Sequence, residues 1–278
     1  MSADLLSREG LTERPSGVWD YVSPSRLNLW LRCPLAFRLK YIDGVPTSTS
    51  PAMFVGKMVH RGLEMYYRHR QLGITLTVAE VMAGMEAGWK RAAATEGVRF
   101  TDLADDELCR KQAAGLVVAY LHQVPIEEPR PLAVEVAVEA PLVDPTTGED
   151  FGLPLVGIID LVQAETNGPV IADFKTSSRS SEPMEVSHEV QLSSYAYLFR
   201  QVYPVEEAAL EIRQLVKTKL PQVNIHRYQA RTAGHFRRLF AVIRAYLDDL
   251  DASRFVYRPG LACGMCDFRE THCRSWLR

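Results

Sequence analysis

The sequence of 278 residues lacks an apolar run of the roughly 20 residues that a membrane-spanning helix needs. Its N-terminal stretch contains acidic residues and no apolar core, which argues against a signal peptide. It also lacks an excess of either charge, because 32 lysines and arginines face 34 aspartates and glutamates, and the formal net charge is -2. We therefore expect a cytoplasmic protein whose contacts with any polyanion are confined to a local groove.

Cysteine is scarce as well, and the odd number of five in a reducing compartment favours metal ligands over disulfides. Cys263, Cys266 and Cys273 have the spacing C-x₂-C-x₆-C, and Cys33 lies far upstream. Four thiolates suit either Zn²⁺ or an iron–sulfur cluster, and the spacing alone does not decide between them. His272 could replace one thiolate in a zinc site.

The chain divides into a helical first part and a β-rich second part, without internal repeats. Apolar residues at helical spacing predict helices over 23–42 (broken at Pro34), 51–71, 77–97, 106–124, 188–204 and 232–251. Alternating or valine-rich runs predict strands over 132–143, 153–165, 169–178, 208–218 and 223–229. This order indicates an α+β fold. We expect a flexible lead over 1–20 and one domain over 21–278, comprising a helical region (21–128), a core (129–230) and a C-terminal helix with a cysteine-bearing tail (231–278).

An acid and a lysine lie side by side on the predicted strand 169–178. Asp173 and Lys175 are two residues apart, so their side chains share a face. Asp160 is on the preceding strand, and the Thr-Asn-Gly sequence between the strands predicts a hairpin that brings the two carboxylates together. Neighbouring carboxylates repel unless a cation lies between them, and their oxygens suit Mg²⁺ or Mn²⁺. The simpler interpretation is an Asp–Lys ion pair on a solvated strand face.

Gly-Ile-Ile-Asp, followed after 12 residues by Asp-Phe-Lys, resembles the core motif of PD-(D/E)XK nucleases. Downstream, Gln191 and Tyr195 resemble the Q-x-x-x-Y helix motif of RecB-like members, and their spacing puts them on one helix face. Upstream, Gly-Lys-Met-Val-His-Arg-Gly-Leu-Glu resembles the helix that carries a metal-binding histidine, here His60. The strand over 132–143 resembles the first core strand, whose acid corresponds best to Glu135, with Glu139 as the alternative.

The cysteines extend the resemblance. One N-terminal and three C-terminal cysteines are similar to the pattern in RecB-like nucleases of the AddB type and in CRISPR-associated nucleases that process new spacers. This resemblance implies a [4Fe–4S] cluster held by Cys33, Cys263, Cys266 and Cys273, which would tie the first helix to the C-terminal tail. Zn²⁺ at the same residues remains the alternative.

The resemblance therefore implies a restriction-endonuclease-like core, with a mixed sheet flanked by helices, that hydrolyses DNA phosphodiester bonds. Such an enzyme is expected to act as an exonuclease on single-stranded DNA or DNA ends, in repair, recombination, CRISPR adaptation or defence. His60, Asp160 and Asp173 would bind Mg²⁺ or Mn²⁺. The expected catalytic residues are Asp160, Asp173, Lys175, Gln191, Tyr195 and Glu135.

Basic residues are expected to contact DNA. Arg26 and Arg32 alternate with aromatic residues in the segment 23–42, and Arg179 follows the acid–lysine strand, so each is a candidate for phosphate contact. The sequence contains no G-x-x-x-x-G-K-[ST] motif, so any unwinding would need a helicase partner. The alternative function is a non-catalytic iron–sulfur subunit that binds DNA or serves as a scaffold in a helicase–nuclease or defence complex.

Overall fold

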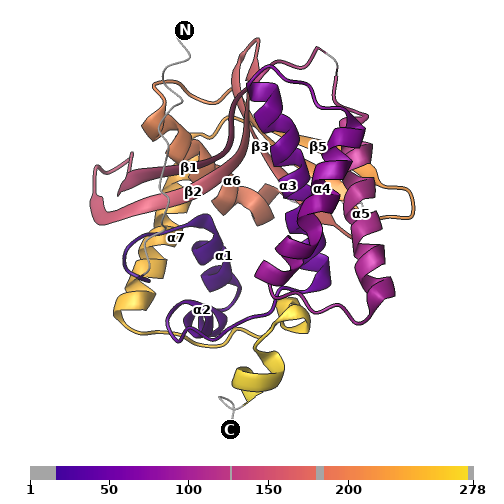
Figure 1. Cartoon of the computed structure of the whole chain (residues 1–278). Helices are drawn as coiled ribbons and strands as arrows, with labels where there is room; N and C mark the ends of the chain where they lie inside the picture. The colour runs from indigo at the N-terminus through magenta and orange to yellow at the C-terminus, as the bar shows by residue number, and fades with distance from the viewer. Residues whose placement is uncertain (1–16, 126, 180–184, 275–278) are drawn as a thin grey trace.

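The computed structural model describes residues 17–125, 127–179 and 185–274 (Figure 1), so most of the predicted lead over 1–20 lies outside the described residues. The helices are α1 (Pro24–Arg32), α2 (Pro34–Tyr41), α3 (Pro51–Gln71), α4 (Val78–Thr95), α5 (Leu103–Leu121), α6 (Glu185–Val202) and α7 (Ala233–Asp251), followed by the short turns η2 (Leu261–Met265) and η3 (Arg269–Cys273). The strands are β1 (Pro131–Val143), β2 (Asp150–Glu165), β3 (Gly168–Ser177), β4 (Ala209–Val216) and β5 (Gln222–Gln229). Each predicted helix and strand is present, with ends shifted by a few residues.

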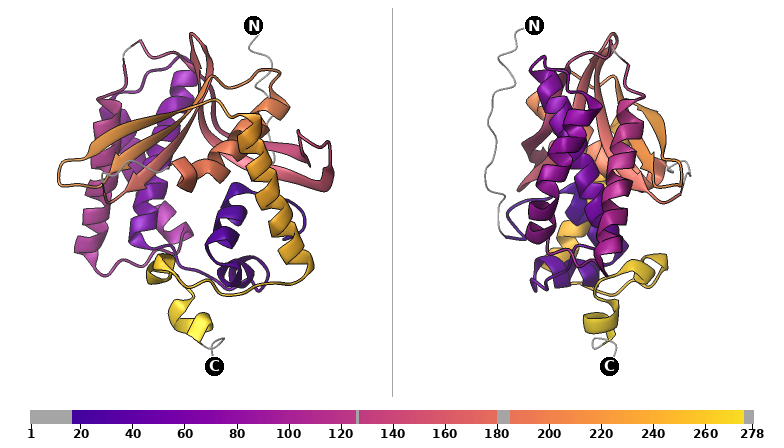
Figure 2. Two further views of the ribbon diagram at one scale, coloured as in Figure 1. Left: turned by 180° about the vertical axis from the view of Figure 1, so that it is seen from behind. Right: turned by 45° about the vertical axis from the view of Figure 1, so that its right-hand side comes forward.

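The five strands form one mixed sheet in the order β1-β2-β3-β4-β5. Neighbouring strands are antiparallel except β3 and β4, which are parallel. A parallel pair needs a crossover connection, and α6 supplies it. Helices α1, α6 and α7 lie on one side of the sheet and α3, α4 and α5 on the other (Figures 1 and 2). The predicted α+β fold is therefore confirmed.

Side-chain caps define where the N-terminal helices begin. Ser23, Ser50, Thr77 and Asp102 each accept a hydrogen bond from the backbone N–H three residues later, at the starts of α1, α3, α4 and α5. Pro34 begins α2, and because proline has no N–H to continue the preceding helix, the chain breaks between α1 and α2 as predicted.

The sheet separates two hydrophobic cores. Phe37, Phe240 and Tyr246 are fully buried in the core under α6 and α7, whereas Phe54 and Tyr67 are fully buried in the core under α3, α4 and α5. Burying a large apolar side chain contributes about 1.5–3 kcal/mol, so each core holds its own layer of helices against the sheet. Among the described residues, none of the helices has the length and apolar character needed to cross a lipid bilayer.

Strands β1 and β2 change faces partway along their length. Val134 packs in the core under α3, whereas Val136, two residues later, packs against the core under α6. Side chains two apart on a regular strand point the same way, so the strand switches face at Glu135. The backbone of Glu135 has a φ of 44°, a conformation that is uncommon for residues other than glycine. The same switch occurs across Asp160 in β2, where Ile159 and Leu161 pack in opposite cores.

The C-terminal segment meets α2 at one corner of the molecule. The Leu35 N–H donates to the Val256 carbonyl at 3.2 Å, and Phe268 packs with Leu35, Ala36 and Leu39 in a small hydrophobic cluster. Figures 1 and 2 both show the C-terminal turns beside α2. We call α2 and residues 256–273 the C-terminal corner. The expected meeting of the first helices and the tail is therefore seen.

Candidate active site

Two acids of the site lie opposite each other on neighbouring strands. The residues flanking Glu135 in β1 pair with those flanking Asp160 in β2, so the two acids share one level of the sheet. Both lie at the point where their strands switch face. The left-handed backbone at Glu135 is strained for a side chain of this kind, and such strain is concentrated at functional sites.

Strands β2 and β3 separate at the site. Their regular pairing extends to Leu161 and Ala172, and Asp160 and Asp173 are the next residues on the two strands. The Asp160 side chain continues the contact, since its Oδ2 accepts a hydrogen bond from the Phe174 N–H at 2.8 Å. Asp160 and Asp173 are 8% and 2% exposed, so two carboxylates are buried next to each other, as the predicted hairpin required.

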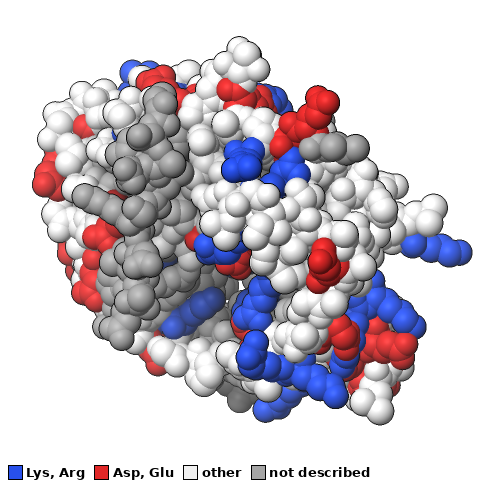
Figure 3. All heavy atoms as spheres, turned by 45° about the horizontal axis from the view of Figure 1, so that its top comes forward, with Lys and Arg blue, Asp and Glu red and all other residues white. Residues whose placement is uncertain are grey.

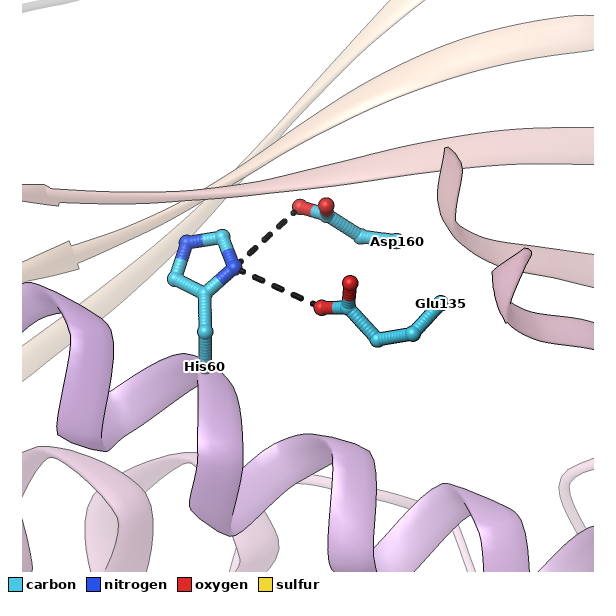
Figure 4. A group of neighbouring side chains, drawn as sticks. All are labelled: His60, Glu135 and Asp160. Carbon is cyan, nitrogen blue, oxygen red and sulfur yellow. Dashed lines mark ion pairs between the residues drawn. The ribbon is translucent and has the colours of Figure 1, made fainter. Parts of the chain in front are cut away.

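His60 approaches the acids from α3. Its Nδ1 lies 3.6 Å from Asp160 Oδ2 and 3.8 Å from Glu135 Oε1, as Figure 4 shows. One possible ligand atom from each of the three residues lies within 4.8 Å of the others, a group compact enough to hold a metal ion. One imidazole and two carboxylates suit Mn²⁺, and carboxylate oxygens also suit Mg²⁺.

Two glycines allow helices to approach the strands closely. A Cβ at Gly56 would lie 2.9 Å from Thr176 Oγ1, so this glycine lets α3 pass close to β3 one turn before His60. A Cβ at Gly157 would lie 2.7 Å from Leu198 Cδ1, so this glycine seats α6 on β2. Both belong to the quoted motifs, but only the structure explains why they are glycines.

Asp173 is contacted by Lys175 and Gln191. Lys175 Nζ lies 2.6 Å from its Oδ2, and Gln191 Nε2 donates to its Oδ1 at 2.8 Å. Gln191 Nε2 also lies 2.9 Å from the Tyr195 hydroxyl oxygen, so the predicted helix pair acts on the acid–lysine strand. The structure therefore places His60, Glu135 and Asp160 together, with Asp173, Lys175, Gln191 and Tyr195 beside them.

The buried acids alter the ionisation of the site. Burial, followed by the charge of Asp173, raises the pKa of Asp160 to about 7. Burial alone would lower the pKa of His60, but Glu135, Asp160 and Asp173 outweigh it and raise the pKa. Burial also opposes the charge of Lys175, and Asp173 and Asp160 again raise its pKa above the ordinary value. The site therefore favours positive charge, as a cation site must.

The predicted DNA-contacting arginines have different locations. Arg26 is 3% exposed, and its guanidinium donates to the backbone carbonyls of Tyr21, Val18 and Gly17 at 2.6, 3.2 and 3.0 Å. A guanidinium that is buried and bound to three carbonyls cannot contact a phosphate. The prediction that Arg26 contacts DNA is therefore wrong, and this residue has a structural role. Arg32 and Arg179 are exposed. Figure 3 shows lysine and arginine side chains around a hollow on one face of the molecule, with acidic side chains among them.

The four predicted cluster cysteines lie in the C-terminal corner. Cys33, Cys266 and Cys273 pack against its small hydrophobic cluster. Burial, and then the neighbouring thiols of Cys33, Cys266 and Cys263, raise the pKa of Cys273. Within the described part of the chain, however, the group of ligand atoms that meets the 4.8 Å separation is the His60 group. The cysteines share a corner without forming a tight ligand set.

The family match agrees with this geometry. The family model for the PD-(D/E)XK nuclease superfamily matches residues 21–274. A crystal structure from Eubacterium rectale, of a protein named "Putative exonuclease", superposes with a TM-score of 0.59 at 14% identity, covering 95% of this chain and 94% of that one. The structure of SSO0001 has a TM-score of 0.44 at 12% identity, covering 95% and 88%. No curated protein matches the sequence. The family match spans nearly the whole chain and includes each residue of the site, and the chain belongs to the PD-(D/E)XK nuclease superfamily.

Proposed function

We propose that the protein is a Mg²⁺- or Mn²⁺-dependent deoxyribonuclease that acts as an exonuclease on single-stranded DNA or DNA ends. The observation that carries this proposal is the compact group of His60, Glu135 and Asp160 next to the Lys175–Asp173 pair. The name of the Eubacterium rectale neighbour supports exonuclease activity, and membership of the nuclease superfamily supports phosphodiester hydrolysis.

Each side chain has a role in this proposal. His60, Glu135 and Asp160 bind the metal, and Asp173, whose charge acts on both His60 and Asp160, is the further predicted ligand. A divalent ion held there would supply polarisation of the phosphoryl oxygen and a more acidic water. Because the pKa of Lys175 is raised, its side chain is charged, and it either positions the attacking water or stabilises charge on the phosphate.

Around this centre, Gln191 holds the carboxylate of Asp173, and Tyr195 lies within hydrogen-bonding distance of Gln191. Because Asp173 is the partner of Lys175, the helix pair keeps the lysine beside the metal site. Arg32 and Arg179 are proposed to contact DNA phosphates, since both are exposed. The enzyme is proposed to work in repair, recombination, CRISPR adaptation or defence, together with a helicase.

The test compares cleavage of end-labelled single- and double-stranded DNA, with free and blocked ends, in Mn²⁺. Lys175→Ala should lower single-turnover cleavage by about two to three orders of magnitude, because a preorganised charge is lost. DNA binding in Ca²⁺ should stay the same. Lys40→Ala, which removes an exposed lysine of α2, is the matched control and should cleave normally. A wild-type protein that binds DNA but cuts none of the substrates would instead favour the scaffold function.

The cofactor proposal concerns the C-terminal corner. We propose that Cys33, Cys263, Cys266 and Cys273 hold a [4Fe–4S] cluster that ties α2 to the C-terminal segment. The shared corner and the influence of the other three thiols on Cys273 support it. The similarity of the four-cysteine pattern to that of AddB-type nucleases favours this cluster over a single Zn²⁺ at the same residues.

Anaerobically purified protein should be brown and contain iron, and Cys33→Ser should lose the metal and lower the melting temperature. Cys109→Ser is the control, because Cys109 is buried in the core under α3 and lies apart from the corner. A colourless protein with about one zinc per chain would replace the iron–sulfur proposal with a zinc site of the same four residues.

A further inference from the structure

Phe174, the middle residue of Asp-Phe-Lys, contacts the histidine of the site. Its side chain is 2% exposed, and its ring lies edge-to-face with His60, with centroids 6.1 Å apart. On the same helix, Tyr67 stacks on Phe174 with centroids 6.2 Å apart. His60 and Tyr67 are seven residues, about two turns, apart on α3, so both face Phe174. The phenyl ring of Phe174 therefore packs against both His60 and Tyr67.

The aromatic neighbours of Phe174 are themselves held in place. Tyr120 packs edge-to-face on Phe174 at 5.4 Å, and its hydroxyl lies 2.7 Å from the hydroxyl of Tyr67. Arg213 Nη1 donates to the Tyr120 hydroxyl at 2.6 Å, and Glu211 fixes the guanidinium at 2.9 Å. A buried hydrogen-bonded network of this kind restricts its members to one arrangement. The ring that contacts His60 is thus the end of a rigid group.

The backbone of the same residue supports a second ligand. The Phe174 N–H donates to Asp160 Oδ2 at 2.8 Å, the oxygen that also lies 3.6 Å from His60 Nδ1. Phe174 therefore contacts two of the three grouped residues, one through its ring and the other through its amide. A substitution of the side chain removes the first contact and keeps the second.

We propose that the Phe174 ring is a positioning residue that fixes the imidazole of His60 for metal binding. This inference deepens the proposed function and rests on it. A free imidazole would lose rotational freedom when it binds a metal, and a ring already held by Phe174 loses less. Groups that orient metal ligands typically change metal affinity about 10- to 100-fold when they are removed.

The test is the Mn²⁺ affinity of metal-free protein, measured by titration calorimetry or by the Mn²⁺ electron paramagnetic resonance signal. Phe174→Leu should weaken Mn²⁺ binding about 10- to 100-fold. Phe54→Leu is the matched control: Phe54 is fully buried on the same helix as His60, but it packs on Trp89 and Phe100. Phe54→Leu should lower the melting temperature about as much as Phe174→Leu does, and it should leave Mn²⁺ affinity within about twofold of wild type.

A double-mutant cycle with His60→Ala separates positioning from general damage. If Phe174 acts through His60, Phe174→Leu should have no further effect on Mn²⁺ affinity once the imidazole is gone. An equal loss in both backgrounds, or wild-type affinity in Phe174→Leu, would overturn the proposal. Failure of the proposed function has a different signature, since the wild-type protein would then bind no Mn²⁺ or would bind it without cleaving DNA.

Discussion

Two clusters of charged side chains on the same sheet and its neighbouring helix differ in their balance of positive and negative charge. The active-site cluster has three carboxylates against one lysine and one histidine: Glu135, Asp160, Asp173, Lys175 and His60. The Arg213 network has three arginines and three glutamates, joined by contacts of 2.7–3.8 Å: Arg70, Arg213, Arg227, Glu128, Glu165 and Glu211. A balanced network needs no further ion and loses stability when one partner is removed, whereas an excess of buried acid favours binding of a further cation.

The ionisation of the two clusters follows this difference. Burial and Asp173 raise the pKa of Asp160 to about 7, so part of the active-site charge is lost near neutral pH. Burial also opposes the charge of Arg213, but Tyr120, Tyr67 and Glu211 more than offset it, and its pKa lies above the ordinary value. The same sheet therefore carries one charge cluster with equal numbers of arginines and glutamates and one with an excess of carboxylates.

The largest expected effect comes from removing an acid of the active-site cluster. Glu135→Gln should reduce Mn²⁺-dependent cleavage at least about 10³-fold, since it removes a proposed metal ligand. Glu139→Gln is the matched control, because Glu139 is exposed on the same strand. End-labelled DNA under single-turnover conditions measures both. Equal loss in the two variants would contradict the assignment of Glu135.

The next effect concerns the balanced cluster. Arg213→Ala should lower the free energy of unfolding by about 3 kcal/mol, because Glu211 and Glu128 each lose one of their two arginine partners while only 6% and 9% of their side chains are exposed. Urea unfolding followed by circular dichroism measures the change. Arg237→Ala, on the exposed side of α7, should change stability by less than about 0.5 kcal/mol. A loss of the same size in Arg237→Ala would show that the effect is unrelated to the network.

Metal should stabilise the folded protein by binding at the active-site cluster and not at the Arg213 network. At a free Mn²⁺ concentration of 100 times the dissociation constant, wild-type protein should gain about 2.7 kcal/mol of unfolding free energy. Asp160→Asn should gain much less, whereas Arg213→Ala should gain as much as wild type. Melting curves with Mn²⁺ and with a chelator give the comparison. Equal stabilisation of Asp160→Asn would mean that Mn²⁺ binds elsewhere.

The smallest effect is a pH dependence. Because the pKa of Asp160 is about 7 in the folded protein and 3.8 as a reference, the folded state binds more protons between these values. This residue therefore makes metal-free protein less stable as pH rises through that window. In Asp160→Asn the free energy of unfolding should fall less between pH 5 and pH 8. Urea unfolding at these two pH values, with a chelator present, measures the difference. An unchanged slope would contradict the raised pKa.

Much of the site followed from periodicity. The two-residue spacing of Asp173 and Lys175 predicts a shared strand face, and the four-residue spacing of Gln191 and Tyr195 predicts a shared helix face. The structure joins these pairs through the contact of Gln191 with Asp173. His60 could not be found by spacing, because α3 meets the sheet only in three dimensions, and the family resemblance supplied it.

Other features depend on packing that a pattern does not record. Glu135 and Glu139 share strand parity, and what separates them is the face switch at Glu135, with its φ of 44°. Arg26 lies in a segment where basic and aromatic residues alternate, as in a DNA contact, yet three backbone carbonyls bind its guanidinium in the interior. In each case the deciding partners are carbonyls or distant side chains that the local sequence does not specify.

The C-terminal corner has a consequence for folding. The hydrogen bond from Leu35 to Val256 joins residues 221 positions apart (256 − 35), so the corner depends on some of the most distant contacts in the chain. Contacts between distant residues carry a large loop-closure entropy and form slowly unless the intervening chain is already compact. The sheet and its two cores lie between these residues and must therefore assemble first. A cofactor bound at this corner would join the chain only after the nuclease core had folded, and it would then lock the last part to form.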